Sequence, residues 1–140
     1  MAFLTLLLFF TNPDSPSVGV SLQDSVASSP QAVFRSVEQG IRSGTIGSLA
    51  PFFGKQVSMT IRGSESGVFS SAQALTILKS YFSGRKLLQF SFSQMVDSVA
   101  SPYATGRMIL TSRGGKESVQ VYLSLTRQDS QWVLTQFNLY

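Results

Sequence analysis

Regular alternation of apolar and polar residues in the second half of the chain is the feature that most limits its fold. Apolar residues occupy every second position over 103–112 and again over 118–126. This period of two is typical of β-strands with one buried face. The Gly114-Gly115 pair between the two runs predicts a tight hairpin turn, so the two strands are expected to be antiparallel. One face of this sheet is apolar, and another part of the chain must cover it.

The last strand carries a change of phase that predicts a β-bulge. Its first apolar positions, Trp132 and Leu134, are out of phase with Phe137 and Leu139. One extra residue near Thr135-Gln136 would bring all four side chains to the same face of the sheet.

Helix signals dominate the first half of the domain. Ser29-Pro30 combines an N-cap residue with proline at the first helical position, and apolar residues then recur at helical spacing up to Ile41. A second helix with a wide apolar stripe is predicted from Ser70 or Ser71 to Ser83. The other predicted elements are a short helix over 46–53 and strands over 56–62, 88–92 and 132–140, with irregular chain over 95–102. Early helices and late strands indicate an α+β fold, an antiparallel sheet covered by two to three helices.

The absence of histidine and cysteine excludes much of the common chemistry of protein sites. Disulfides, thiol nucleophiles, cysteine-ligated zinc sites and histidine-based triads are all ruled out. No phosphate-loop glycine pattern or ligand cluster is present either, so we expect no metal and no cofactor. Charged residues make up 13% of the chain, whereas serine occurs 24 times and threonine 9 times. A surface wetted by hydroxyl groups favours binding or assembly over catalysis.

The basic balance of the chain does not by itself indicate nucleic-acid binding. The formal net charge is +4, but the basic residues are scattered, and Arg85-Lys86 is the only adjacent pair. Nucleic-acid binders usually concentrate their positive charge or interleave it with aromatic residues. We therefore expect a mildly basic, solvated surface and no nucleic-acid partner.

An apolar run at the start of the chain predicts export. Residues 2–10 read AFLTLLLFF, which is too short for a membrane span but fits the apolar core of a signal peptide. No basic residue precedes the run, a departure from the usual signal pattern, and a buried N-terminal strand or helix is the alternative. We expect residues 1–19 to be a signal peptide, 20–28 a linker and 29–140 a single domain, in a periplasmic or extracellular protein without a transmembrane span.

Several segments together resemble one superfamily. They are the helix at 33–41, GTIGSLAPFF at 44–53, the strand at 56–61 and WVLTQFNL at 132–139. This order resembles the nuclear transport factor 2-like superfamily of cone-shaped α+β barrels, also described as a cystatin-like fold. FSSAQALTILKSYF at 69–82, with Ala104-Thr105-Gly106, further resembles an uncharacterised bacterial domain-of-unknown-function group within it.

The resemblance implies a curved sheet that encloses a conical pocket together with the helices. It also implies that the outer sheet face is a dimer surface. Members include isomerases, dehydratases, polyketide cyclases and non-catalytic modules, so the fold does not decide the function. A dehydratase of this superfamily would use histidine, and this chain has none.

Two residues are weak candidates for catalysis. Asp97 is the one carboxylate that closely follows an aromatic strand, in a segment that could rim the cone; its alternative role is a loop residue capping a turn. Tyr81 could present its hydroxyl to a ligand from the second helix; its alternative role is a core tyrosine with a satisfied hydroxyl. Arg107 is expected to point away from the cone.

Apolar and polar residues of the strands define two further candidate sites. The residues expected to line a ligand pocket, or to fill it, are Phe90, Phe92, Met108, Val121 and Leu123. The outer face is expected to carry a homodimer contact or to be solvated; its candidate residues are Gln120, Tyr122 and Ser124.

The sequence thus predicts an exported, non-catalytic domain that binds a small apolar ligand or a protein partner of the cell envelope. The alternatives are an isomerase- or cyclase-type enzyme that uses Asp97 or Tyr81, and a purely structural dimerisation module.

Overall fold

The computed structural model describes residues 29–140, which form three helices and one six-stranded sheet. The helices are α2 (Pro30–Arg42), the 3₁₀ helix η2 (Ile46–Phe52) and α3 (Ser71–Ser83). The strands are β1 (Phe53–Ile61), β2 (Ser66–Ser70), β3 (Lys86–Val96), β4 (Tyr103–Ser112), β5 (Gly115–Gln128) and β6 (Gln131–Leu139). The predicted α+β class is confirmed. The expected signal peptide and linker lie outside the described residues.

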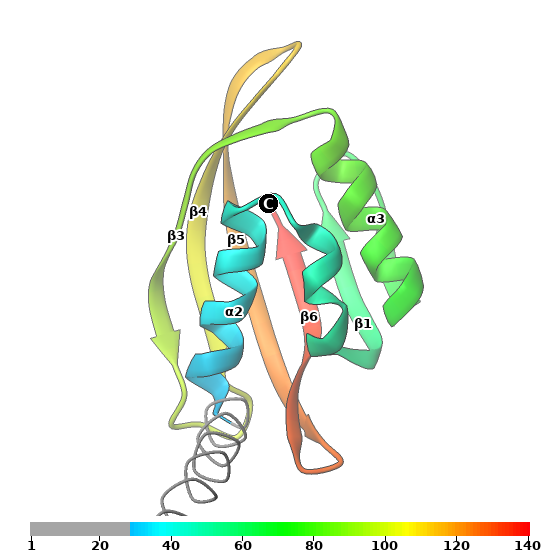
Figure 1. Ribbon diagram of the computed structural model, residues 1–140, viewed down its shortest axis with the longest axis vertical. Helices are drawn as coiled ribbons and strands as arrows, with labels where there is room; N and C mark the ends of the chain where they lie inside the picture. The colour runs from blue at the N-terminus through cyan, green and yellow to red at the C-terminus, as the bar shows by residue number, and fades with distance from the viewer. Residues whose placement is uncertain (1–28) are drawn as a thin grey trace, which may run out of the picture.

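Figure 1 shows the helices in one layer against one face of the curved sheet. We call this the helix face and the opposite one the open face. Each long helix begins at a serine cap: Ser29 Oγ accepts from the Ala32 N–H at 3.1 Å, and Ser70 forms a capping box with Gln73. Between residues 29 and 140, no helix is long and apolar enough to cross a membrane.

The strand order is β2-β1-β6-β5-β4-β3, and the sheet is mixed. All neighbouring strands are antiparallel except β1 and β6, which run parallel with Ile61 opposite Leu139. The antiparallel arrangement expected from the hairpin turns is present from β3 to β6. Hairpin turns report only on strands that are neighbours in sequence, so they did not predict the parallel pair. The pairing of β1 with β6 joins segments far apart in the chain and has no local signal.

The bulge expected in the last strand is confirmed. Ser124 pairs with Gln136 whereas Leu125 pairs with Leu134, so Thr135 is the extra residue of β6. Its insertion lets Leu134 and Phe137 share the core, and both are fully buried.

A second bulge, in β3, was not expected. Leu87 pairs with Leu110 but Gln89 pairs with Ile109, so Leu88 is the extra residue. Alternation within the strand predicted over 88–92 puts Leu88 on the same face as Phe90 and Phe92, and this is wrong: Leu88 is 48% exposed, and Leu87 packs against the core instead.

Candidate functional site

The predicted pocket residues lie together on the helix face of the sheet. Phe90 pairs with Met108 across β3 and β4, and Val121 and Leu123 project from β5 beside them. These four side chains are at most 1% exposed. Phe92 is partly buried and packs edge-on against Phe90, with ring centroids 5.0 Å apart. The five residues belong to, or pack against, the close-packed core.

Helix α2 is fixed to this face by a ring contact and a hydrogen bond. The ring of Phe34 packs edge-on against Phe92 at 6.0 Å. Glu38 Oε2 accepts a hydrogen bond from the Phe92 N–H at 3.0 Å. The carboxylate thereby satisfies a backbone donor of the edge strand β3. Glu38 thus serves the structure, and sequence reasoning did not assign it this role.

Tyr81 lies at the end of α3 inside a small polar cluster. The guanidinium of Arg85 lies 4.1 Å from the centre of its ring and donates to its carbonyl oxygen at 2.9 Å. The same guanidinium pairs with Glu117 Oε1 at 3.0 Å. Burial raises the pKa of the Tyr81 hydroxyl, and the positive charge of Arg85 opposes this shift. The hydroxyl is therefore protonated at neutral pH and suited to donating a hydrogen bond.

Asp97 and Tyr81 are not brought together. Asp97 is exposed and directly follows the end of β3, whereas Tyr81 contacts Arg85 directly before that strand begins. β3 pairs with the nine residues from Thr111 to Tyr103 of β4, so its two ends lie roughly 30 Å apart at about 3.3 Å per residue. They cannot act on one small substrate. Within the described part of the chain, acidic residues form no cluster suited to a metal ion.

The open face of the sheet presents two rows of uncharged side chains across five strands. Cross-strand pairing aligns the residues of each row. The first row is Thr105, Tyr122, Asn138, Thr60 and Ser66, and the second is Tyr103, Ser124, Gln136, Ser58 and Val68. We call these ten residues the neutral band. Two of the predicted dimer-face residues, Tyr122 and Ser124, lie in it, and Gln120 lies in the adjoining row opposite Arg107. Arg107 points away from the helix face, as expected.

Several side chains of the neutral band are held in place by contacts with neighbouring residues. The rings of Tyr103 and Tyr122 stack at 5.8 Å. Asn138 is 4% exposed; its Oδ1 accepts from the Thr60 N–H at 3.1 Å and its Nδ2 donates to the Tyr140 hydroxyl at 3.0 Å. Sequence reasoning missed Asn138 and Thr60, because they meet only through the parallel pairing of β1 with β6.

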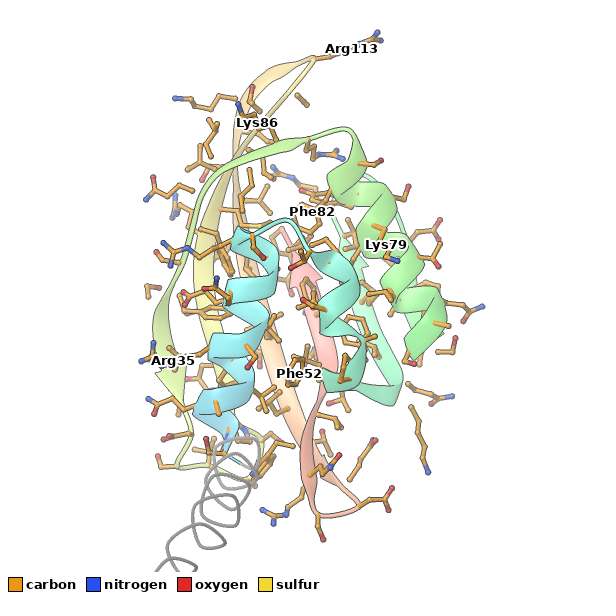
Figure 2. All side chains as sticks on the ribbon, in the orientation of Figure 1. Arg35, Phe52, Lys79, Phe82, Lys86 and Arg113 are labelled. Atoms are coloured by element: carbon orange, nitrogen blue, oxygen red, sulfur yellow. The ribbon has the colours of Figure 1, made fainter. Side chains whose placement is uncertain are left out.

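A groove with a volume of about 640 Å³ lies between α2 and η2. Arg35 and Phe52 are among its lining residues, and a smaller groove of about 320 Å³ between η2 and α3 includes Lys79 and Phe82. Figure 2 shows these four side chains on the helix side of the molecule. Neither groove is lined by a predicted pocket residue.

Comparison with protein families gives one match, which covers most of the domain. A family model described as a domain of unknown function, DUF4783, matches residues 34–139. A comparison with curated proteins finds no match.

Solved structures share the fold at low sequence identity. A DUF4783 family protein from Bacteroides uniformis ATCC 8492 is 16% identical, with a TM-score of 0.67, over 75% of this chain and 93% of that one. An NTF-2 like protein of unknown function from Shewanella oneidensis MR-1 is 13% identical, with a TM-score of 0.54, over 89% and 98% of the two chains. A ketosteroid isomerase-like protein from Erwinia carotovora atroseptica SCRI1043 is 11% identical, with a TM-score of 0.61, over 78% and 90%. The fold is therefore that of the nuclear transport factor 2-like proteins.

Proposed function

The chain belongs to the DUF4783 family of domains of unknown function, and we propose that it is a non-catalytic protein-interaction domain whose neutral band binds a second copy of the chain. The band, a wide uncharged surface on the open face of the sheet, carries this proposal. The centres of protein interfaces are depleted of charge and enriched in tyrosine. The band follows this pattern with two stacked tyrosines and no charged side chain.

The composition of the band also favours association over mere solvation. Tyr103, Tyr122 and Gln136 are only partly exposed, and contacts within the face hold several side chains in place. A surface that is ordered before binding loses less conformational entropy when a partner covers it. A two-fold axis brings the same surface of two copies together, so a second copy is the simplest partner for this face.

The arrangement of the helix face gives less support to a ligand site or an enzyme. The apolar candidates Phe90, Met108, Val121 and Leu123 are packed among core side chains. The catalytic candidates Asp97 and Tyr81 stand near opposite ends of β3. The small apolar ligand and the isomerase- or cyclase-type reaction remain the alternatives to the protein partner.

Sedimentation velocity of the purified protein over a range of concentrations tests the proposal. We expect a concentration-dependent dimer that Gln136→Arg or Thr105→Arg weakens, because each places a charge inside the band. Ser36→Arg adds the same charge at an exposed position of α2, away from the band, and is expected to leave the dimer intact. A wild-type protein that stays monomeric, or equal weakening by all three variants, overturns the proposal.

We also propose that the protein is exported, on the strength of the apolar run at 2–10. Mass spectrometry of the mature protein, after expression of the full chain in a bacterium, is expected to find a new start near Val20. Recovery of the protein in the cytosol with Met1 retained contradicts this.

A further inference from the structure

Three strands extend beyond the rest of the sheet as an arm. β6 and β1 end side by side, at Leu139 and Ile61, and Leu139 pairs with Val121 of β5. β5 begins six residues before Val121, at Gly115, so it continues past the ends of both strands. Residues 86–89, 109–112 and 115–118, with the turn at 113–114, form the part of the sheet that we call the arm. Figure 1 shows it rising above the body of the molecule.

The open face of the arm gathers basic side chains that are scattered in the sequence. Lys86 and Lys116 both align with Thr111, one on each side of it. They stand roughly 10 Å apart, since each strand spacing is about 4.8 Å. Arg113 lies at the tip, as Figure 2 shows, and Arg107 lies at the base on the same face as Thr111. All four basic side chains are exposed.

No acidic side chain neutralises this group from within the described residues. The acid of the arm, Glu117, pairs with Leu110 and therefore points to the helix face. There it forms an ion pair with Arg85, the one ion pair described between residues 29 and 140. The acid of the arm is thus paired on the helix face, while Lys86 and Lys116 lie on the open face, with Arg107 at the base of the arm and Arg113 at its tip. Such a group repels itself and attracts anions.

We propose that the open face of the arm binds an acidic, extended segment of a partner protein. Arg107, the row of Lys86 and Lys116, and Arg113 follow one another along the strand direction. Side chains on one side of an extended peptide recur about every 6.8 Å, which suits a line of carboxylates. Thr111 and Ser118 lie between the basic residues and offer hydroxyl groups for hydrogen bonds. Arg107 already donates to Ser118 Oγ at 3.3 Å.

The surroundings favour an acidic protein segment over a nucleic acid or a membrane. The arm carries no aromatic side chain on which bases would stack, and the nearby Tyr103 and Tyr122 stack on each other. Leu88, at the edge of the arm, is its one exposed large apolar side chain. Peripheral membrane binding draws on buried apolar surface as well as charge, and a single leucine supplies little of it.

The experiment is a fluorescence-anisotropy titration of the full protein with a labelled peptide of alternating glutamate and serine. We expect binding that weakens with salt and that is about tenfold weaker for the double variant Lys86→Gln, Lys116→Gln. A peptide with glutamine in place of glutamate should not bind. The double variant Arg35→Gln, Lys55→Gln removes the same charge at two exposed positions away from the arm, on α2 and near the start of β1, and should bind as the wild type does.

Four results overturn this inference. They are no binding of the acidic peptide, equal losses for the two double variants, tighter binding of single-stranded DNA than of the peptide, and tighter binding of anionic lipid vesicles. Thermal melts of both double variants confirm that they remain folded. The arm lies outside the neutral band, so a dimer that fails to bind the peptide overturns this inference and leaves the proposed function standing.

Discussion

Single residues determine how closely the strands approach one another, and Gly106 is the clearest case. A Cβ atom at this position would collide with the carbonyl oxygen of Ser91 and would come within 2.9 Å of the Cα of Phe92. Gly114 lies in the turn at the tip of the arm, where an added Cβ meets nothing within 4 Å.

Gly106→Ala is therefore expected to destabilise the fold by about 1–3 kcal/mol, because two backbones must move apart. Gly114→Ala is the matched control. Urea unfolding followed by circular dichroism measures both free energies of unfolding. Equal stability of the two variants would show that β3 and β4 do not approach as closely as described.

A second prediction about a single residue concerns Glu38, whose carboxylate accepts the hydrogen bond from the Phe92 N–H. Glu38→Ala leaves the Phe92 N–H without its acceptor, at a cost of about 1–3 kcal/mol, whereas Glu38→Gln keeps an acceptor oxygen and costs less. Amide hydrogen exchange at Phe92 is expected to quicken in the alanine variant. An unchanged exchange rate would mean that the carboxylate does not protect this edge of the sheet.

The hydroxyl of Tyr81 supplies a prediction about pH. Its pKa is raised in the folded state, so folding favours the protonated form. The stability it contributes is present below the pKa of an unfolded tyrosine and is lost as the pH rises through the folded value. Tyr81→Phe should make unfolding less sensitive to alkaline pH, as measured by urea titrations at several pH values. An unaltered alkaline profile would contradict the burial of this hydroxyl.

At the scale of elements, the sequence predicted what depends on neighbouring residues. The serine caps, the hairpin turn and the bulge at Thr135 all follow from local patterns, and the structure contains each of them. The bulge at Leu88 was missed, because alternation with Phe90 and Phe92 assigns Leu88 to the core face and nothing in the run Leu87-Leu88 marks an extra residue.

Leu87 and Leu88 therefore respond differently to substitution. Leu88→Ser is expected to change the free energy of unfolding by less than about 0.5 kcal/mol, since the side chain is half exposed. Leu87→Ser should cost about 1 kcal/mol or more, because this side chain packs against the core. Chemical denaturation measures the free energy of unfolding of both variants. A larger loss for Leu88→Ser than for Leu87→Ser would show that Leu88, and not Leu87, faces the core.

The alternation within each strand predicted which face of the sheet a candidate residue lies on, but not which distant residues it meets. Alternation placed Phe90, Met108 and Val121 on one face and Tyr122 on the other, and the structure agrees. Whether Asp97 and Tyr81 meet depends on the tertiary path of the chain, which no local pattern encodes. The partners of Tyr122 across β6 and β1 were hidden for the same reason.

At the scale of the whole molecule, the open face divides into two regions of different charge. The neutral band spans five strands, and the basic group lies on the arm beyond it. The sequence showed eleven basic residues without a cluster, and the fold brings four of them together. We therefore expect the two regions to bind different partners.

The central claim is that two copies meet through the neutral band, and the absence of cysteine allows a direct measurement of it. Gln120→Cys supplies a single attachment point for a spin label on the open face, in the row beside the band, and Ser36→Cys supplies one on the helix side. Pulsed electron paramagnetic resonance then measures the distance between the labels of two copies. We predict a short, well-defined distance for the label at 120 and a much longer one for the label at 36. A shorter distance for the label at 36, or no coupling for either label, would contradict the account.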